Sequence, residues 1–336
     1  MSGSRAVVVD APGAARLVSG DRPDPGPGEV RIRVAAAGIC LSDRELYDGR
    51  RDPAHVRYPV TPGHEWSGTV DAVGEGVDPA LTGRPAVAEG FRSCGTCERC
   101  RAGETSLCDA GYEETGFTCP GAFADHLVVP ARLLHPLADG ADLRAAALLE
   151  PAAVVAAAVR AGRPEPGERI AVVGAGTLGL LAVQLIAATS PAQLTVIDPR
   201  TERARLALDF GATGIRAPGD AEAGRHDLVI ETAGAPTTAA GSCLLARRGG
   251  RVVLTGMFAP GATGIDPVHL ALNQLTVRSV FGAPSAAWSF AVRAFTAGIL
   301  DPAPLITHEL PLERYADALA LVGGGDPGTG KVLLRP

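Results

Sequence analysis

Residues 170–186, IAVVGAGTLGLLAVQLI, decide the fold class of this chain. A short apolar run leads through three glycines, Gly174, Gly176 and Gly179, into a longer apolar run of helical length. The G-x-G-x-x-G pattern alone is weak evidence, because chance matches are frequent in a chain with 42 glycines. Between a strand and a helix, however, such glycines permit a tight turn, close approach of a pyrophosphate and contact between helix and strand. The stretch therefore predicts a dinucleotide site at the N-terminus of a helix.

The residue after the next expected strand indicates which dinucleotide is bound. Asp198 lies about twenty residues beyond the glycines, where a carboxylate binds the ribose 2′-hydroxyl of NAD. The alternative is a surface carboxylate that caps the next helix. A carboxylate here repels a 2′-phosphate, so NAD is favoured, although Arg200 and Arg203 follow closely and would accommodate that phosphate of NADP. The predicted cofactor site comprises Gly174, Gly176, Thr177, Leu178, Gly179, Asp198, Arg203 and Thr232.

Strand-like and helix-like segments alternate around these glycines. The expected strands are Ile170–Val173, Leu194–Ile197, Asp227–Glu231 and Arg251–Thr255, and the expected helices are Pro151–Ala161, Leu178–Thr189, Glu202–Phe210 and Thr237–Arg247. Such alternation is typical of a parallel, doubly wound α/β sheet. Residues 151–281 are therefore predicted to form the dinucleotide-binding domain.

The N-terminal part of the chain has a different pattern. Short β segments broken by glycine and proline are expected at Arg5–Val9, Glu29–Ala35, Trp66–Val73 and residues 121–130. They suit a small, mostly antiparallel, barrel-like domain. The C-terminal residues contain helices and a final short strand, which we expect to return to this domain. The second predicted domain thus comprises residues 1–150 and 282–336.

Four cysteines crowd into one lobe near residues 90–110. Their C-x2-C-x2-C-x7-C spacing lets three thiolates converge from one turn while the fourth returns, which suits tetrahedral zinc. Two disulfides, a redox centre or four unrelated thiols are the alternatives. The N-terminus lacks a signal-peptide pattern, so we expect a cytoplasmic protein with reduced thiols, which favours a metal. Four thiolates leave no open position on the ion, so a structural zinc site is predicted at Cys94, Cys97, Cys100 and Cys108.

Composition excludes other classes of protein. The 336 residues suggest about two domains, and 46% hydrophobic content is ample for packed cores. The net charge of −6, with scattered arginines and the single lysine Lys331, argues against a nucleic-acid partner. No run of about 20 apolar residues occurs, so no membrane span is predicted.

Further metal-ligand candidates lie outside the cysteine lobe. Cys40, His64 and Glu150 offer one thiolate, one imidazole and one carboxylate, a donor set for a zinc ion that keeps a position open for substrate. Each also has an ordinary explanation: a buried thiol, a hydrogen-bonded turn residue and the cap of the next helix. Spacing alone leaves both interpretations open.

Nearly end to end, the chain resembles the zinc-containing medium-chain dehydrogenases/reductases, especially their polyol (sorbitol-like) and threonine dehydrogenase branch. The resemblance is carried, in order, by GIC-x-SD, PGHE-x-SG, CG-x-C-x2-C-x7-C, GAFADH, LEP, GAGTLG, DLVIETAG, RRGGRVVLTGM and GKVLL. It implies a GroES-like catalytic domain beside a Rossmann domain. It also implies an alcohol dehydrogenase with catalytic and structural zinc.

The resemblance gives roles to particular residues. It makes Cys40, His64 and Glu150 the catalytic zinc ligands, with Glu at the third position as in the polyol branch. Glu65 would lie beside the metal and bind it directly or exchange with water. The other two implied roles are a hydrogen bond from His64 to Asp43, and a place for Ser42 next to the substrate oxygen.

One departure concerns the proton path. Zinc as a Lewis acid would stabilise an alkoxide while Ser42 passes the released proton outward and a hydride goes to the nicotinamide. Many relatives have His five residues after the cysteine as the outer member of this relay, and this chain has Glu45. Our hypothesis is that Glu45 or a water completes the relay.

The expected activity is hydride transfer between NAD and a secondary alcohol, such as a polyol, sugar or cyclitol. The GHEWSGTV and GFTCPGAFADH runs resemble those of cyclitol and aminocyclitol dehydrogenases. A zinc-free quinone-reductase-like enzyme and a non-catalytic NAD-binding protein are the alternatives. From the family we expect a homodimer or homotetramer, and the apolar stretch Leu275–Phe281 is a candidate edge strand for subunit pairing.

Overall fold

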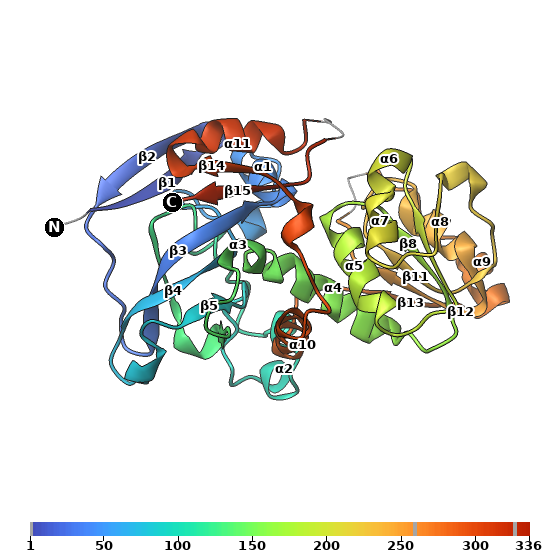
Figure 1. The fold of residues 1–336 in the computed structure, drawn as a ribbon, viewed down its shortest axis with the longest axis horizontal. Coiled ribbons are helices and arrows are strands. Elements are labelled where there is room, and N and C mark those ends of the chain that lie inside the picture. The colour runs from blue at the N-terminus through green and yellow to red at the C-terminus, as the bar shows by residue number, and fades with distance from the viewer. Residues whose placement is uncertain (1–2, 258–260, 325–327) are drawn as a thin grey trace. The chain divides into compact units, whose positions relative to one another are not determined.

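The computed structural model describes residues 3–257, 261–324 and 328–336, which divide into two compact units (Figure 1). The first unit comprises residues 1–150, 284–296 and 302–336, and the second comprises residues 151–283 and 297–301. The expected fold class, a GroES-like β-rich domain with a Rossmann-like parallel sheet, is confirmed.

The first unit is built on a seven-stranded sheet in the order β14-β15-β3-β4-β5-β7, with β6 also paired to β3 and a separate β1–β2 hairpin. Its strands are β1 Ser4–Ala11, β2 Ala14–Gly20, β3 Glu29–Ile39, β4 Glu65–Val73, β5 Pro85–Ala88, β6 His126–Pro130, β7 Leu134–Pro136, β14 Ile306–Pro311 and β15 Lys331–Arg335. Its helices are α1 Leu41–Tyr47, α2 Glu98–Arg101, α3 Leu143–Ala146, α10 Ser285–Thr296 and α11 Tyr315–Leu321. Strand β3 alternates along its first half, burying Val30, Ile32 and Val34 in the core of this unit.

The C-terminal strand β15 is what returns the end of the chain to this sheet. It pairs antiparallel with β3, with Val332 opposite Ile39, while β4 pairs with the other side of β3 so that Gly38 faces Glu65. Three segments far apart in sequence therefore meet at the end of β3, just before Cys40.

The second unit holds a six-stranded, wholly parallel sheet in the order β10-β9-β8-β11-β12-β13. Its strands are β8 Arg169–Val173, β9 Gln193–Ile197, β10 Gly214–Arg216, β11 His226–Glu231, β12 Ala246–Leu254 and β13 Thr276–Ser279. The helices are α4 Leu149–Gly162, which starts at the end of the first unit, α5 Thr177–Ala187, α6 Thr201–Ala204, α7 Leu206–Asp209, α8 Thr238–Leu245 and α9 Pro267–Asn273. Strand β8 is buried along Ile170–Val173, as expected for a strand covered on both faces.

Several expected elements differ in extent, among them two helices and one strand. The helix expected at Glu202–Phe210 divides at Arg205, where bonds between residues three apart (Leu208 to Arg205, Phe210 to Ala207) replace the regular α-helical ladder. The strand expected at residues 121–130 starts only at His126, because the amides of residues 121–123 donate to the carbonyls of residues 61–63 instead of to a sheet neighbour. The helix expected to reach Arg247 ends at Leu245, where β12 begins.

Candidate active site

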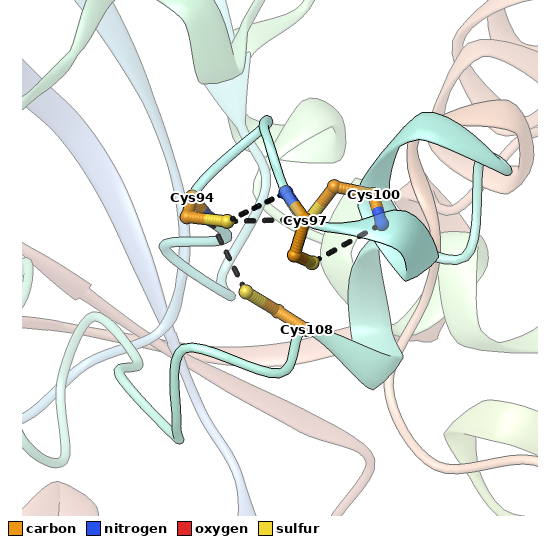
Figure 2. Close-up of side chains that lie close together, drawn as sticks. All are labelled: Cys94, Cys97, Cys100 and Cys108. Carbon is orange, nitrogen blue, oxygen red and sulfur yellow. Dashed lines mark hydrogen bonds between the residues drawn. The ribbon is translucent and has the colours of Figure 1, made fainter.

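The structure brings the four cysteines of the lobe together (Figure 2). The sulfur atoms of Cys94, Cys97, Cys100 and Cys108 all lie within 4.8 Å of one another. Backbone amides donate to these sulfurs: Cys97 N and Thr96 N each lie 3.4 Å from Cys94 Sγ, and Cys100 N lies 3.4 Å from Cys97 Sγ. The Thr96 amide and hydroxyl, with the Cys97 amide, lower the pKa of Cys94 to about 5. A pre-stabilised thiolate among four converging sulfurs fits a structural zinc ion.

A second convergence occurs where β3 ends. The donor atoms of Cys40, His64 and Glu65 lie within 4.8 Å of one another. Cys40 follows β3 and caps α1, while His64 and Glu65 stand at the start of β4. Gly38 makes room for Glu65, because a Cβ at position 38 would collide with the Glu65 carboxylate. Sulfur, nitrogen and carboxylate oxygen form a donor set that fits zinc, and three protein ligands leave a position open.

Asp43 supports the backbone around this second cluster. It is almost wholly buried, and its Oδ2 accepts a hydrogen bond of 2.8 Å from Cys40 N while its Oδ1 accepts one of 3.2 Å from Gly63 N. His64 Nδ1 lies 3.4 Å from Asp43 Oδ1, an ionic contact whose geometry falls short of a hydrogen bond. Burial alone would lower the pKa of His64, but Asp43 and Cys40 outweigh burial and raise that pKa well above its ordinary value. The neighbourhood thus favours positive charge, which a divalent cation supplies in place of a proton.

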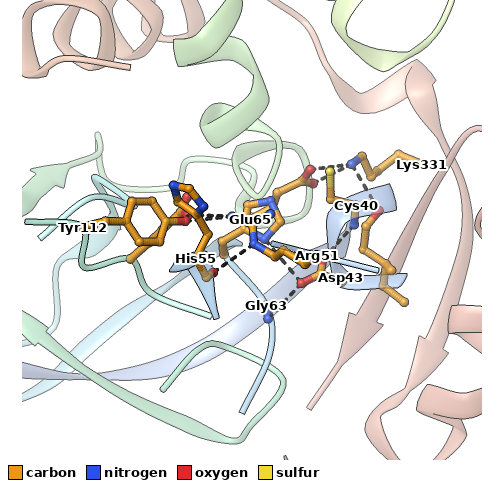
Figure 3. Close-up of polar contacts among 11 residues, drawn as sticks. Cys40, Asp43, Arg51, His55, Gly63, Glu65, Tyr112 and Lys331 are labelled. Carbon is orange, nitrogen blue, oxygen red and sulfur yellow. Dashed lines mark hydrogen bonds and ion pairs between the residues drawn. The ribbon is translucent and has the colours of Figure 1, made fainter. Parts of the chain in front are cut away.

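Lys331 is the residue of this cluster that sequence reasoning missed. Its Nζ lies 2.6 and 2.7 Å from the two oxygens of Glu65 and donates a 3.3 Å bond to Ile39 O (Figure 3). Both side chains are buried, with residue exposures of 5% for Lys331 and 1% for Glu65. A signal existed: the only lysine of the chain stands in an apolar strand, GKVLL, where a charge needs a partner.

The other predicted catalytic residues lie near the cluster without belonging to it. Ser42 and Glu45 stand on α1, which begins directly after Cys40. Glu150 stands in the first turn of α4, outside the group whose donor atoms lie within 4.8 Å. Burial raises the pKa of Glu150 to about 8, and the carboxylates of Glu65 and Glu114 act in the same direction while His64 opposes them. A carboxyl held this close to other acids favours a cation among them.

An aromatic and ionic wall borders His64. The Phe117 ring lies 4.7 Å from the His64 ring, and the Arg51 guanidinium stacks 3.5 Å above Phe117. Arg51 also donates to Tyr112 Oη at 2.7 Å (Figure 3) and to Glu114 at 3.3 Å. This wall fixes one side of the imidazole with side chains from two loops.

In the second unit, the glycines lie where β8 passes into α5. A Cβ on Gly179 would overlap Gly174 O, so the helix touches the strand end directly, and Gly174 has a φ of +105°. Around Gly176 no atom lies within 4 Å of a built Cβ, which leaves space for a ligand. Thr177 and Leu178 open α5, and the Thr232 hydroxyl donates a 2.8 Å bond to Val173 O beside the loop.

Asp198 ends up buried at the end of β9, with an exposure of 2%. Its Oδ2 accepts a 2.7 Å bond from Ala175 N in the glycine loop, and its two oxygens each lie 3.0 Å from the Arg200 guanidinium. Burial raises the pKa of Asp198, but these bonds outweigh it and leave that pKa below 3.8. Arg203 donates a 3.1 Å bond to Ala175 O. Both arginines therefore lie beside the glycine loop.

The two units define a class of protein: a metal-binding β-rich unit joined to a dinucleotide-binding unit, as in metal-dependent oxidoreductases. Family models agree. Residues 26–139 match the alcohol dehydrogenase GroES-like domain and residues 177–297 match the zinc-binding dehydrogenase domain. The chain is 31% identical over 322 residues to 2-dehydro-3-deoxy-L-galactonate 5-dehydrogenase of Pseudoalteromonas atlantica, covering 93% of each chain.

Solved structures agree over the whole length. A zinc-binding dehydrogenase of Sinorhizobium meliloti bound to NADP superposes with a TM-score of 0.93 at 29% identity, covering 100% of both chains. The rspB alcohol dehydrogenase of Escherichia coli CFT073 with NADH gives 0.92 at 27% identity, again over 100% of both chains. This chain belongs to the zinc-containing alcohol dehydrogenase superfamily of medium-chain dehydrogenases/reductases. It is an NAD(P)-dependent oxidoreductase, and the zinc-free and non-catalytic alternatives are not favoured.

Among the described residues, no helix is long and apolar enough to cross a membrane.

Proposed function

We propose that this enzyme interconverts a secondary alcohol of a polyol, sugar or cyclitol and the corresponding ketone, with NAD as partner. The observation that carries the proposal is the convergence of Cys40, His64 and Glu65 within 4.8 Å. A relative that acts on a sugar acid supports the substrate class. Residues 1–150 and 282–336 are assigned the catalytic role, and residues 151–281 hold the cofactor.

The chain's own residues divide the chemistry among them. Cys40, His64 and Glu150 would hold the catalytic zinc, and Glu65, tied to Lys331, would lie beside it as the carboxylate that exchanges with water. Bound zinc supplies Lewis acidity that favours an alcohol as its alkoxide, and NAD supplies the hydride acceptor. Ser42 Oγ would accept the hydroxyl proton of the substrate while its own proton passes to the Glu45 carboxylate or to a water.

A metal-content and turnover experiment tests this proposal. Wild-type protein should carry two zinc ions per chain and form NADH from members of a panel of polyols, sugars and cyclitols. Cys40→Ser should retain the zinc of the cysteine lobe, lose the other ion and lose turnover. Full turnover with zinc only in the cysteine lobe would refute it.

The proton relay has a separate test. Glu45→Ala should slow the reaction and shift the pH profile of its rate. An unchanged pH profile would show that Glu45 takes no part in the relay.

NAD is proposed over NADP because the buried Asp198 carboxylate lies beside the glycine loop. The Arg200 guanidinium, being tied to Asp198, supports the same preference, since it is not free to receive a 2′-phosphate. Comparison of kcat/KM and of the dissociation constants for both cofactors tests the assignment. A preference for NADP would overturn it.

We also propose a homodimer or homotetramer in the cytoplasm. Strand β13 stands at the edge of the six-stranded sheet, and an open edge invites a second strand. Thiolates that hold zinc must stay reduced, and a reducing compartment such as the cytoplasm keeps them so. Light scattering tests the assembly, and a monomer at working concentration would exclude it.

A further inference from the structure

Glu231 is a buried carboxylate that the chemistry above does not use. It ends β11, and its residue exposure is 0%. Its Oε1 accepts hydrogen bonds of 2.8 Å from both Ala233 N and Gly234 N, in the loop after β11. Its Oε2 accepts one of 3.2 Å from Gly256 N, in the loop after β12. One side chain therefore bonds to the backbones of two successive loops.

These loops lie at the edge of the sheet that binds ligands. In open parallel sheets a dinucleotide lies across the carboxyl ends of the strands, at the point where the strand order reverses. Here that point lies between β8, followed along one side by β9, and β11, followed along the other by β12. The glycine loop and Asp198 occupy the β8–β9 side, so the loops after β11 and β12 receive the nicotinamide half.

The two loops approach each other too closely for side chains. A Cβ on Gly256 would lie 2.6 Å from Glu231 Oε2 and would collide with Gly234 N. Gly234, with a φ of +64°, would place a Cβ 2.6 Å from Met257 O. The Glu231 carbonyl also accepts a 2.9 Å bond from Thr255 N and a further bond from the Thr255 hydroxyl. Spacing of the loops thus depends on one carboxylate between two glycines.

A carboxylate suits this position because both of its oxygens only accept. A glutamine would retain one acceptor and turn an NH2 donor toward an N–H group, leaving one loop without a partner. The neighbouring Thr232 extends the arrangement, because its hydroxyl bonds to Val173 O at the start of the glycine loop. Residues 231 and 232 together connect three loops of the cofactor edge.

We propose that Glu231 is a positioning residue that sets the spacing of the loops after β11 and β12 and so the affinity for the nicotinamide half of NAD(H). The inference rests on the proposed function, since it takes NAD(H) as the ligand.

The test compares Glu231→Gln with Asp227→Asn in the zinc-loaded enzyme. Asp227 lies on the same strand at the opposite end, where it pairs with Arg169 and Arg247. Asp227→Asn therefore also removes one carboxylate charge, but it destabilises the end of the strand that is remote from the two loops. Fluorescence titration measures the dissociation constant of NADH, and calorimetry measures Tm. Hydrogen exchange is followed at the amides of residues 232–234 and 255–257.

Glu231→Gln should weaken NADH binding about tenfold, or by about 1.4 kcal/mol, and should speed exchange in both loops. Asp227→Asn should lower Tm and leave the NADH dissociation constant and loop exchange at wild-type values. An unchanged dissociation constant for Glu231→Gln, or equal weakening by Asp227→Asn, overturns the inference. Wild-type protein that binds no NADH would instead refute the proposed function.

A second variant covers failure of Glu231→Gln to fold. Gly256→Ala keeps the carboxylate and displaces the same contact from the other loop. It too should weaken NADH binding and speed exchange at residues 232–234. Wild-type affinity in Gly256→Ala would overturn the inference by itself.

Discussion

Lys331 decides the charge balance of the catalytic cluster. Burial by itself would lower the pKa of this lysine, but Glu65, with smaller contributions from Cys40 and Glu150, outweighs burial and raises the pKa above its ordinary value. The ammonium therefore stays charged at neutral pH, and both oxygens of Glu65 contact it. A Glu65 oxygen that binds a metal ion must share its lone pairs between the ion and the Lys331 ammonium. This competition fits the role in which Glu65 exchanges with water at the metal.

Replacing Lys331 by methionine should cost about 3–5 kcal/mol of unfolding free energy, because it leaves the Glu65 charge buried without a partner. Urea unfolding of protein that holds zinc in the cysteine lobe but none at Cys40 and His64 measures the loss, because an ion there would compensate the Glu65 charge. Arg314→Met is the matched control: Arg314 pairs with Asp317, and both side chains are 61% exposed. A surface pair of this kind contributes about 0–1 kcal/mol. Equal losses of unfolding free energy in the two variants would show that the buried Lys331–Glu65 pair contributes no more to stability than a surface pair.

The sequence predicted this cluster only in part, for a physical reason. Ligand types and family motifs were enough to predict Cys40 and His64 as partners, and they do converge. The contact between Lys331 and Glu65 depends on the pairing of β15 with β3, two strands from opposite ends of the chain. No local pattern encodes the register of such a non-local pair. Glu231 escaped notice likewise, because hydrogen bonds to backbone amides leave no mark in residue spacing.

At the scale of elements, β11 is fixed differently at its two ends. Glu231 bonds to loops at the carboxyl end, whereas Asp227, near the amino end, accepts a 2.8 Å bond from Arg169 N of β8 and pairs with Arg247 of β12. The same strand thus has a cofactor-facing end and a purely structural end. Burial raises the pKa of Asp227, but its bonds to Arg247 and Arg169 outweigh burial and hold that pKa below 3.8.

Asp227, at the amino end of β11, should make the free energy of unfolding depend on pH in the acid range. Because the folded pKa of Asp227 is depressed, its contribution is fully present above the unfolded value of about 3.9 and is lost as pH falls further. Asp227→Asn should therefore cost about 1–2 kcal/mol at pH 7. The gap to wild type should narrow below pH 4, as urea unfolding from pH 7 to pH 3 would show. A gap that is constant across this range would contradict the assignment.

Helix α10 is linked to the cysteine lobe by hydrogen bonds between partly buried side chains. Glu89 Oε2 accepts a 2.9 Å bond from the Ser285 hydroxyl, and the Ser285 amide donates a 3.0 Å bond to Thr105 Oγ1. Thr105 lies in the segment between Cys100 and Cys108. Glu89 also contacts His135, whose Nε2 lies 3.3 Å from the Glu89 carboxylate, and the His135 ring stacks on the Trp288 ring of α10. A change in the conformation of the cysteine lobe should therefore alter the stability of the first turn of α10.

Glu89→Ala should loosen the first turn of α10 and cost about 1–3 kcal/mol, because the variant removes the charged acceptor that the half-buried Ser285 hydroxyl and His135 imidazole share. Hydrogen exchange should speed up at residues 285–289. Thr296→Ala serves as the control: it removes a 2.9 Å bond to Val292 O at the exposed end of the same helix, and we expect a change within about 0.5 kcal/mol. Unaltered exchange at residues 285–289 in Glu89→Ala would rule out the link.

At the scale of the whole molecule, each unit has its own core and its own ligands. The core of the first unit includes Val30, Ile32 and Trp66, and that of the second includes Ala171, Val229 and Val252. Aliphatic side chains dominate both, in keeping with the aromatic content of only 4% in the chain. Both metal clusters belong to the first unit, and the glycine loop with Asp198 and Glu231 belongs to the second.

This division predicts that metal and cofactor stabilise different parts of the chain. A ligand that binds only the folded form adds about 2.7 kcal/mol when present at a hundred times its dissociation constant. NADH at that excess should slow exchange chiefly in residues 151–283, since the proposed cofactor site lies there. Chelation should speed exchange chiefly in residues 1–150, because emptied thiolates lose the ion that holds the lobe together. Hydrogen exchange read by mass spectrometry, with and without each treatment, separates the two effects. If chelation released residues 151–283 first, the metal would support the cofactor unit, and the separation of roles argued from the two cores would be wrong.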